Sequence, residues 1–106
     1  MTLKYLVTGG SGFIGTNIIE LLRRHKHSVV NLDVNEPLHQ DHLSYWYKCD
    51  IRDLSDLKSH IGYHKPDVIL HFAARTDLKG DTLDCYTSNT VGVENLVHVC
   101  NENKFI

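Results

Sequence analysis

Four glycines lie within eight residues of the segment TGGSGFIG, Thr8–Gly15. Glycines between a strand and a helix allow a tight turn and let a phosphate approach the main chain without meeting a Cβ. The free amides and the positive dipole of the helix N-terminus then face the anion. The segment contains GxGxxG at Gly10, Gly12 and Gly15, and equally GxxGxxG at Gly9, Gly12 and Gly15. These residue types at this spacing favour the binding of a pyrophosphate group.

An acidic residue at the end of a second apolar run completes the pattern. Asp33 closes SVVNLD and follows Gly15 by 18 residues, near the spacing of about 20 expected for the acid that binds a ribose in dinucleotide sites. A nucleoside triphosphate loop needs a lysine after its last glycine, whereas Thr16 follows Gly15. The sequence therefore predicts dinucleotide binding and disfavours ATP or GTP hydrolysis.

The elements that must position these residues alternate between strand-like and helical periods, which predicts an α/β fold with a parallel sheet. The run DVILHFAA is nearly all apolar, which is typical of a strand covered on both faces at the centre of a sheet. Helical spacing begins at Ile14, and the second helix is expected to end at Gly62 and Pro66. The expected strands are Leu3–Val7, Ser28–Asp33, Tyr45–Cys49, Asp67–Ala74 and the start of another at Lys104–Ile106; the expected helices are the one from the glycines to Arg23–His27, the face Ile51–Ile61, and the one marked by Tyr86–Cys100.

Composition excludes several classes of function. The 106 residues are 42% hydrophobic, enough for one core and a single domain, residues 1–106. A net charge of -2 without a basic stripe argues against nucleic acid as a partner. The sequence contains no run of about 18 apolar residues, so it predicts no membrane segment. Cys49, Cys85 and Cys100 lack metal-type spacing, so we expect thiols in a reducing compartment, by default the cytoplasm.

Four motifs, in order, resemble those of the extended short-chain dehydrogenase/reductase family, the NAD-dependent epimerases and dehydratases that mostly act on nucleotide sugars. TGGSGFIG is similar to the family's TGxxGxxG turn, with LD at Leu32–Asp33 as its ribose-binding strand end. CDIRD, HFAA and YTSNTVGVENL resemble its adenine segment, its HxAA run and its YxxNxxGxxNL helix. The resemblance covers the whole chain and implies NAD as cofactor. It also implies a Rossmann-type, doubly wound parallel sheet that is incomplete here, with strand order 3-2-1-4.

The resemblance also implies individual roles. Gly9, Gly10, Gly12 and Gly15 would admit the pyrophosphate, Phe13 and Ile14 would offer backbone amides, and Asp33 would bind the ribose. Asp50 and Ile51 would hold the adenine, although Asp50 could instead cap the following helix, as could Asp53 or Ser55. Phe72, Ala73 and Ala74 would lie beside the cofactor, although the alanines also suit helix–sheet packing. Asn89 would form hydrogen bonds at the active site or face solvent. Since Val34–Glu36 contain no Arg or Lys, Asp33 favours NAD over NADP.

The histidines do not indicate chemistry of their own. His71 lies in an apolar strand, so we expect a hydrogen-bonded core histidine and no catalytic base. The pairs His25/His27, His39/His42 and His60/His64 have no third ligand at a supporting spacing. The sequence predicts no metal site.

The catalytic pair of the family, a Tyr followed four residues later by a Lys, is absent from these 106 residues. The chain is therefore expected to be the N-terminal part of such an enzyme, inactive alone, whose intact form binds a nucleotide sugar. Alternatives are a non-catalytic dinucleotide sensor, a reductase acting on a non-sugar substrate, or a fragment without cofactor. Self-association or homodimer formation through the unfinished sheet is expected.

Overall fold

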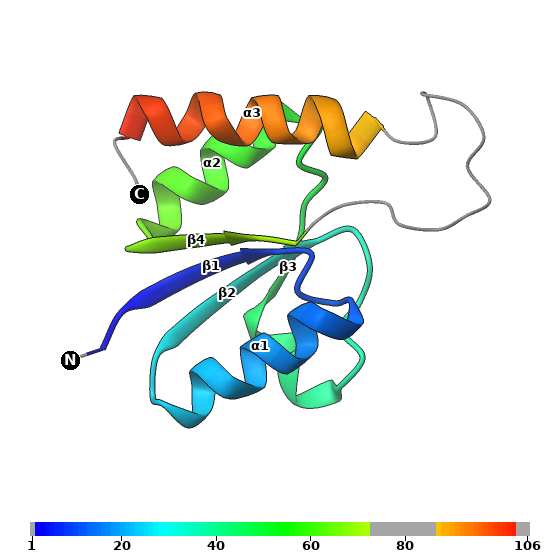
Figure 1. Cartoon of the computed structure of the whole chain (residues 1–106), viewed down its shortest axis with the longest axis vertical. Helices are drawn as coiled ribbons and strands as arrows, with labels where there is room; N and C mark the ends of the chain where they lie inside the picture. The colour runs from blue at the N-terminus through cyan, green and yellow to red at the C-terminus, as the bar shows by residue number, and fades with distance from the viewer. Residues whose placement is uncertain (1, 73–86, 104–106) are drawn as a thin grey trace.

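The computed structural model describes residues 2–72 and 87–103, with side chains in the second range described for residues 92–100. Its centre is a parallel sheet of four strands in the order β3-β2-β1-β4 (Figure 1). The strands are β1 (Lys4–Thr8), β2 (Ser28–Asp33), β3 (Trp46–Lys48) and β4 (Val68–His71). The predicted fold class and strand order are confirmed.

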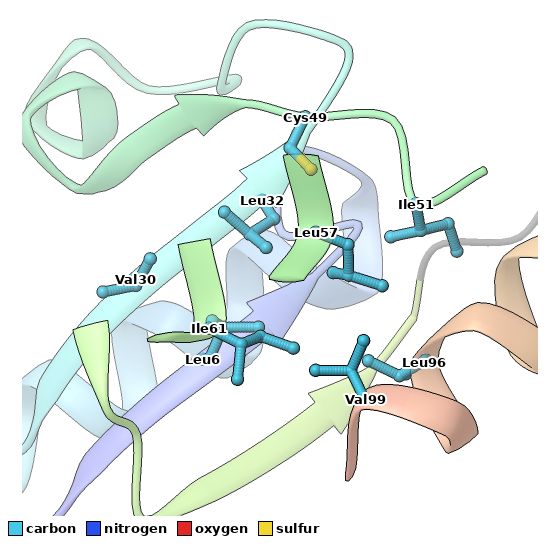
Figure 2. Close-up of a cluster of buried hydrophobic side chains, with 9 residues drawn as sticks. All are labelled: Leu6, Val30, Leu32, Cys49, Ile51, Leu57, Ile61, Leu96 and Val99. Carbon is cyan, nitrogen blue, oxygen red and sulfur yellow. The ribbon is translucent and has the colours of Figure 1, made fainter. Parts of the chain in front are cut away.

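Alternating side chains of the strands divide the interior into two hydrophobic clusters, one on each face. Leu6 of β1 faces α2 (Leu54–His64) and α3 (Thr87–Asn103), where it joins the larger cluster shown in Figure 2. Val7, the next residue, faces α1 (Phe13–Arg24) and packs with Ile19. Because successive side chains of a strand point to opposite faces of the sheet, the neighbours Leu6 and Val7 pack against different helices. A short 3₁₀ helix, η1 (Gln40–Tyr45), precedes β3.

The end of α2 differs from the prediction. Gly62 does not end the helix, which continues to His64. A Cβ at Gly62 would meet nothing within 4 Å. This glycine therefore lies within the helix on its exposed side, where its only cost to stability is the low helix propensity of glycine. Lys65, with φ 49°, turns the chain away directly before Pro66, which cannot continue a helix.

Within the described residues, β4 pairs with β1 alone and is the outer strand of the sheet, as the predicted order 3-2-1-4 requires. Its apolar run is typical of a strand that is central in a complete sheet. All four of its residues are half-buried. The predicted continuation of this strand to Ala74, and the strand expected at Lys104–Ile106, lie outside the described residues. None of the helices in the described part of the chain is long and apolar enough to cross a membrane.

Candidate functional site

The glycines between β1 and α1 meet different structural requirements. Gly9 has a φ of 74°, a conformation that side chains rarely adopt. A Cβ at Gly10 would lie 2.4 Å from Asn31 Oδ1, and one at Gly15 would lie 2.4 Å from the carbonyl oxygen of Gly9. Gly10 and Gly15 are therefore required by packing inside the protein, independently of any ligand.

Gly12 has room for a side chain, unlike Gly10 and Gly15. A Cβ there would have a single neighbour, the Gly9 carbonyl oxygen at an ordinary 3.6 Å. Gly12 caps α1 without a side-chain hydrogen bond, and no acidic residue lies in the first turn. Within the described residues, no group accepts a hydrogen bond from the amides of Phe13 or Ile14. The side chains of these two residues are 79% and 62% exposed. This helix start can accept an anion at its free amides.

Asn31, a residue that the motifs do not identify, holds the loop in place. Its side chain is fully buried, with Oδ1 accepting from the Gly10 amide at 2.8 Å and Nδ2 donating to Ser11 Oγ at 3.1 Å. Ser11 Oγ in turn donates to the carbonyl of Asn35 at 2.7 Å. The sequence signal for this role is an Asn within the apolar run SVVNLD, because a buried side-chain amide needs hydrogen-bond partners.

The Asp33 carboxylate lies directly beside this loop. Its Oδ2 accepts from the Ser11 amide at 3.0 Å, and its Oδ1 accepts from the Asn35 amide at 2.9 Å. Each oxygen keeps a further lone pair that can accept from a hydroxyl. The Asp33 carbonyl accepts from Trp46 Nε1 at 2.8 Å, which ties β3 to the same edge.

Asp50 and Ile51 follow β3 at the same end of the sheet. Asp53 caps α2 by accepting from the Asp56 amide at 3.1 Å, so Asp50 is not the cap. Asp50 instead pairs with the Arg52 guanidinium, at 2.6 Å between Oδ2 and the nearest nitrogen. This hydrogen bond lowers the pKa of Asp50 and keeps it ionised. Ile51 as a whole residue is only 3% exposed, and its side chain belongs to the hydrophobic cluster beneath α2 and α3.

Helix α3 fixes the Asp50–Arg52 segment from the other side. Asn95 Nδ2 donates to the carbonyls of Ile51 and Arg52, each at 2.9 Å. A Cβ at Gly92 would lie 2.4 Å from Ile51 Cδ1, so this glycine permits close approach of the helix. Both Gly92 and Asn95 lie in the helix motif YTSNTVGVENL, but the motif did not predict that they contact the Asp50–Arg52 segment.

The end of β4 meets the end of β1 at Thr8. His71 Nδ1 and Thr8 Oγ1 lie 2.7 Å apart in a hydrogen bond, which confirms the expected bonded histidine. Burial lowers the pKa of His71 and so favours its neutral form. The amide of Phe72 donates to the Thr8 carbonyl at 2.8 Å, which places Phe72 next to the glycine loop.

The structure thus gathers most of the predicted site residues at the carboxyl ends of the parallel strands, where ligands bind in open α/β sheets. The loop after β1, the end of β2 and the segment after β3 lie together at this end of the sheet (Figure 1). Asp33 is the last residue of β2, and Asp50 follows β3 by two residues. Ala73 and Ala74 lie outside the described residues. Asn89 belongs to α3 by its backbone, and its side chain lies outside the description.

The chain is similar in sequence and in fold to several known proteins. The chain is 37% identical to GDP-6-deoxy-D-talose 4-dehydrogenase of Aggregatibacter actinomycetemcomitans over 97 residues, covering 90% of this chain and 29% of that protein. It is 33% identical to the bifunctional protein GAL10 of Candida maltosa, covering 93% of this chain and 74% of that sequence. The crystal structure of Bordetella bronchiseptica WbmH in complex with NAD+ matches with a TM-score of 0.83 and 29% identity, covering 98% of this chain and 37% of that one.

The chain thus spans less than a third of the first of these relatives. The model of the NAD dependent epimerase/dehydratase family matches residues 5–105. The family predicted from the motifs is confirmed. Since the match extends over nearly the whole chain, the protein belongs to the NAD dependent epimerase/dehydratase family.

Proposed function

We propose that this chain is the NAD-binding portion of an epimerase or dehydratase that acts on a nucleotide sugar. The observation that supports it best is Gly12, where, unlike at Gly10 and Gly15, a Cβ would meet no close packing neighbour. An opening kept free beside unpaired amides fits a pyrophosphate. The proposed sugar substrate and the full activity rest on the relatives, of which this chain covers only a part.

The residues fit the parts of the dinucleotide as follows. The amides of Phe13 and Ile14 bind the pyrophosphate at Gly12, and Asp33 accepts from the adenosine ribose. Asp50 and the Ile51 amide bind the adenine edge, held in position by Asn95. The remaining predicted contacts are Phe72, Ala73, Ala74 and Asn89. When bound, NAD supplies a hydride acceptor; these side chains and amides bind and orient it.

The proton donor and acceptor for such a reaction are not among the 106 residues, because none of the five tyrosines is followed four positions later by lysine. We therefore propose that this chain binds the cofactor without turnover. Homodimer formation and a cytoplasmic location also remain predictions.

The test is calorimetric titration of NAD into the wild-type chain and into three glycine variants. Gly12→Ala places a methyl group in the pyrophosphate site and should weaken binding by about tenfold or more, a loss of about 1.4 kcal/mol, with an unchanged melting temperature. Gly62→Ala, on the exposed face of α2, is the matched control and should change neither affinity nor fold. Gly10→Ala should lower the free energy of unfolding by about 1–3 kcal/mol, because its Cβ collides with Asn31.

Equal NAD affinity of the wild type and Gly12→Ala would contradict the assigned site. Failure of the folded wild-type chain to bind NAD would contradict the proposed function itself.

A further inference from the structure

Three side chains with metal-binding donor atoms meet beside α2, away from the glycine loop. Cys49 directly follows β3, whereas Asp56 and His60 lie one turn apart on α2. One donor atom from each residue lies within 4.8 Å of the other two. The spacing of Cys49 from the two helical residues matches no metal motif, so the fold alone brings the three together.

The distances within the cluster suit a tetrahedral cation. Zinc binds sulfur at about 2.3 Å and imidazole nitrogen or carboxylate oxygen at about 2.0–2.2 Å. Two nitrogen or oxygen ligands on a tetrahedral ion are therefore about 3.4 Å apart. His60 Nε2 and Asp56 Oδ1 are 3.5 Å apart, so this pair already has the required separation. The thiol completes the set after a small contraction.

The surroundings attract and admit a cation. The carboxylates of Asp56 and Asp53 place negative charge near the Cys49 sulfur, whereas the charge of Asp50 is paired with Arg52. The Tyr47 ring packs against the His60 ring, with 5.7 Å between centroids, and restricts its orientation. Side-chain exposures of 42% for Asp56 and 20% for His60 leave a path from solvent.

We propose that Cys49 Sγ, an Asp56 carboxylate oxygen and His60 Nε2 bind one divalent cation, with Zn²⁺ the best match and water as the fourth ligand. Thiolate, imidazole and carboxylate are the ligands that zinc prefers. Burial raises the pKa of the Cys49 thiol to about 12, so the thiol is neutral without a cation. Metal binding breaks the S–H bond, forms the metal–sulfur bond and releases the proton to solvent.

The bound cation would join the start of the Asp50–Arg52 segment to α2. Such a link stabilises the folded state, because the unfolded chain does not hold the three ligands together. It would also fix the main chain beside Asp50 and Ile51 without occupying their ligand-binding groups.

The experiment uses the reduced, metal-free chain titrated with Co²⁺ and then with Zn²⁺. We expect one equivalent of Co²⁺ to produce a thiolate-to-cobalt charge-transfer band in the near ultraviolet, which Zn²⁺ then displaces. Zn²⁺ should also raise the melting temperature. Cys49→Ser should abolish the band, and Cys100→Ser is the matched control that should retain it.

Because Cys49 is buried, His60→Gln provides a second variant at a more accessible position, with exposed His25→Gln as its control. His60→Gln should weaken Zn²⁺ binding by about tenfold or more, whereas His25→Gln should leave it unchanged. Circular dichroism confirms that each variant is folded. Absence of the charge-transfer band in the wild type, or equal Zn²⁺ affinity in His60→Gln and wild type, would overturn the proposal.

Discussion

The carboxylate of Asp33 is held by two backbone amides beside the glycine loop. This fixed negative charge can accept hydrogen bonds from ribose hydroxyls, but it repels a phosphate at the 2′ position. The following residues Val34, Asn35 and Glu36 offer no cation to offset the repulsion. Discrimination between the two nicotinamide cofactors is therefore expected at this single residue.

We predict that NADP binds the chain at least about tenfold more weakly than NAD, a difference of about 1.4 kcal/mol. Asp33→Asn should reduce the difference, because the amide keeps the size of the side chain and removes its charge. Asp41→Asn, at an exposed position of η1, makes the same change elsewhere and should leave the ratio unaltered. Both cofactors can be titrated by calorimetry; equal affinities in the wild type would refute the role of Asp33.

At the scale of elements, α3 holds the Asp50–Arg52 segment, which we propose binds the adenine, through the two hydrogen bonds of Asn95. Asn95→Ala should lower the free energy of unfolding by about 1–3 kcal/mol, since two carbonyls lose their donor. NAD affinity should also fall, because the Ile51 amide is no longer held in place. The measurements are urea denaturation and calorimetry, with exposed Glu94→Ala on the same helix as control. Unchanged stability would show that the two bonds contribute nothing.

Helix α1 and η1 are joined by a buried histidine. His42 is fully buried, and its Nε2 lies 2.5 Å from Glu20 Oε1. The hydrogen bond from His42 lowers the pKa of Glu20 below its ordinary 4.5. A lowered pKa in the folded state stabilises that state above the unfolded value, and the stabilisation is lost as the pH falls below 4.5.

We therefore predict that wild-type stability, measured by urea denaturation, decreases more steeply than that of Glu20→Gln as the pH is lowered from about 6 to about 3. Glu36→Gln, which changes an exposed carboxylate, should retain the wild-type slope. If the stability of the wild type and of Glu20→Gln decreased in parallel as the pH is lowered, titration of Glu20 would contribute nothing to the stability of the fold.

The structure of the site could be predicted from the sequence where it depends on neighbouring residues or on a family motif. The loop conformation follows from Gly9 and its neighbours, and the strand order follows from the alternation of strands and helices with the family motifs. The exposed Gly62 could not be identified as an interior helix residue, because its tolerance depends on what packs beside it. The approach of His60 to Cys49 depends in the same way on how α2 lies against β3.

At the scale of the whole molecule, β4 leaves one edge of the described sheet unpaired. Main-chain groups on such an edge can pair with another chain. Val68, Ile69 and Leu70 make this strand apolar, and all are half-buried. Among the described residues, this edge therefore combines main-chain groups that have no strand partner with half-buried hydrophobic side chains.

We predict that the purified chain self-associates through this edge in a concentration-dependent way. Gel filtration coupled to light scattering should show a mass that rises above that of the monomer as concentration increases. Hydrogen exchange gives the location, since β4 amides should become more protected in the associated form. A sharp monomer peak across the concentration range would refute this prediction.

The Asn31 amide has a consequence for the thermodynamics of ligand capture. Because its contacts hold Gly10 and Ser11 in place, the loop acquires its shape during folding and does not wait for a ligand to impose it. The entropy of ordering the loop then belongs to the folding equilibrium and not to the association step. Encounter with the dinucleotide resembles docking to a rigid receptor, and the flexible partner is the ligand.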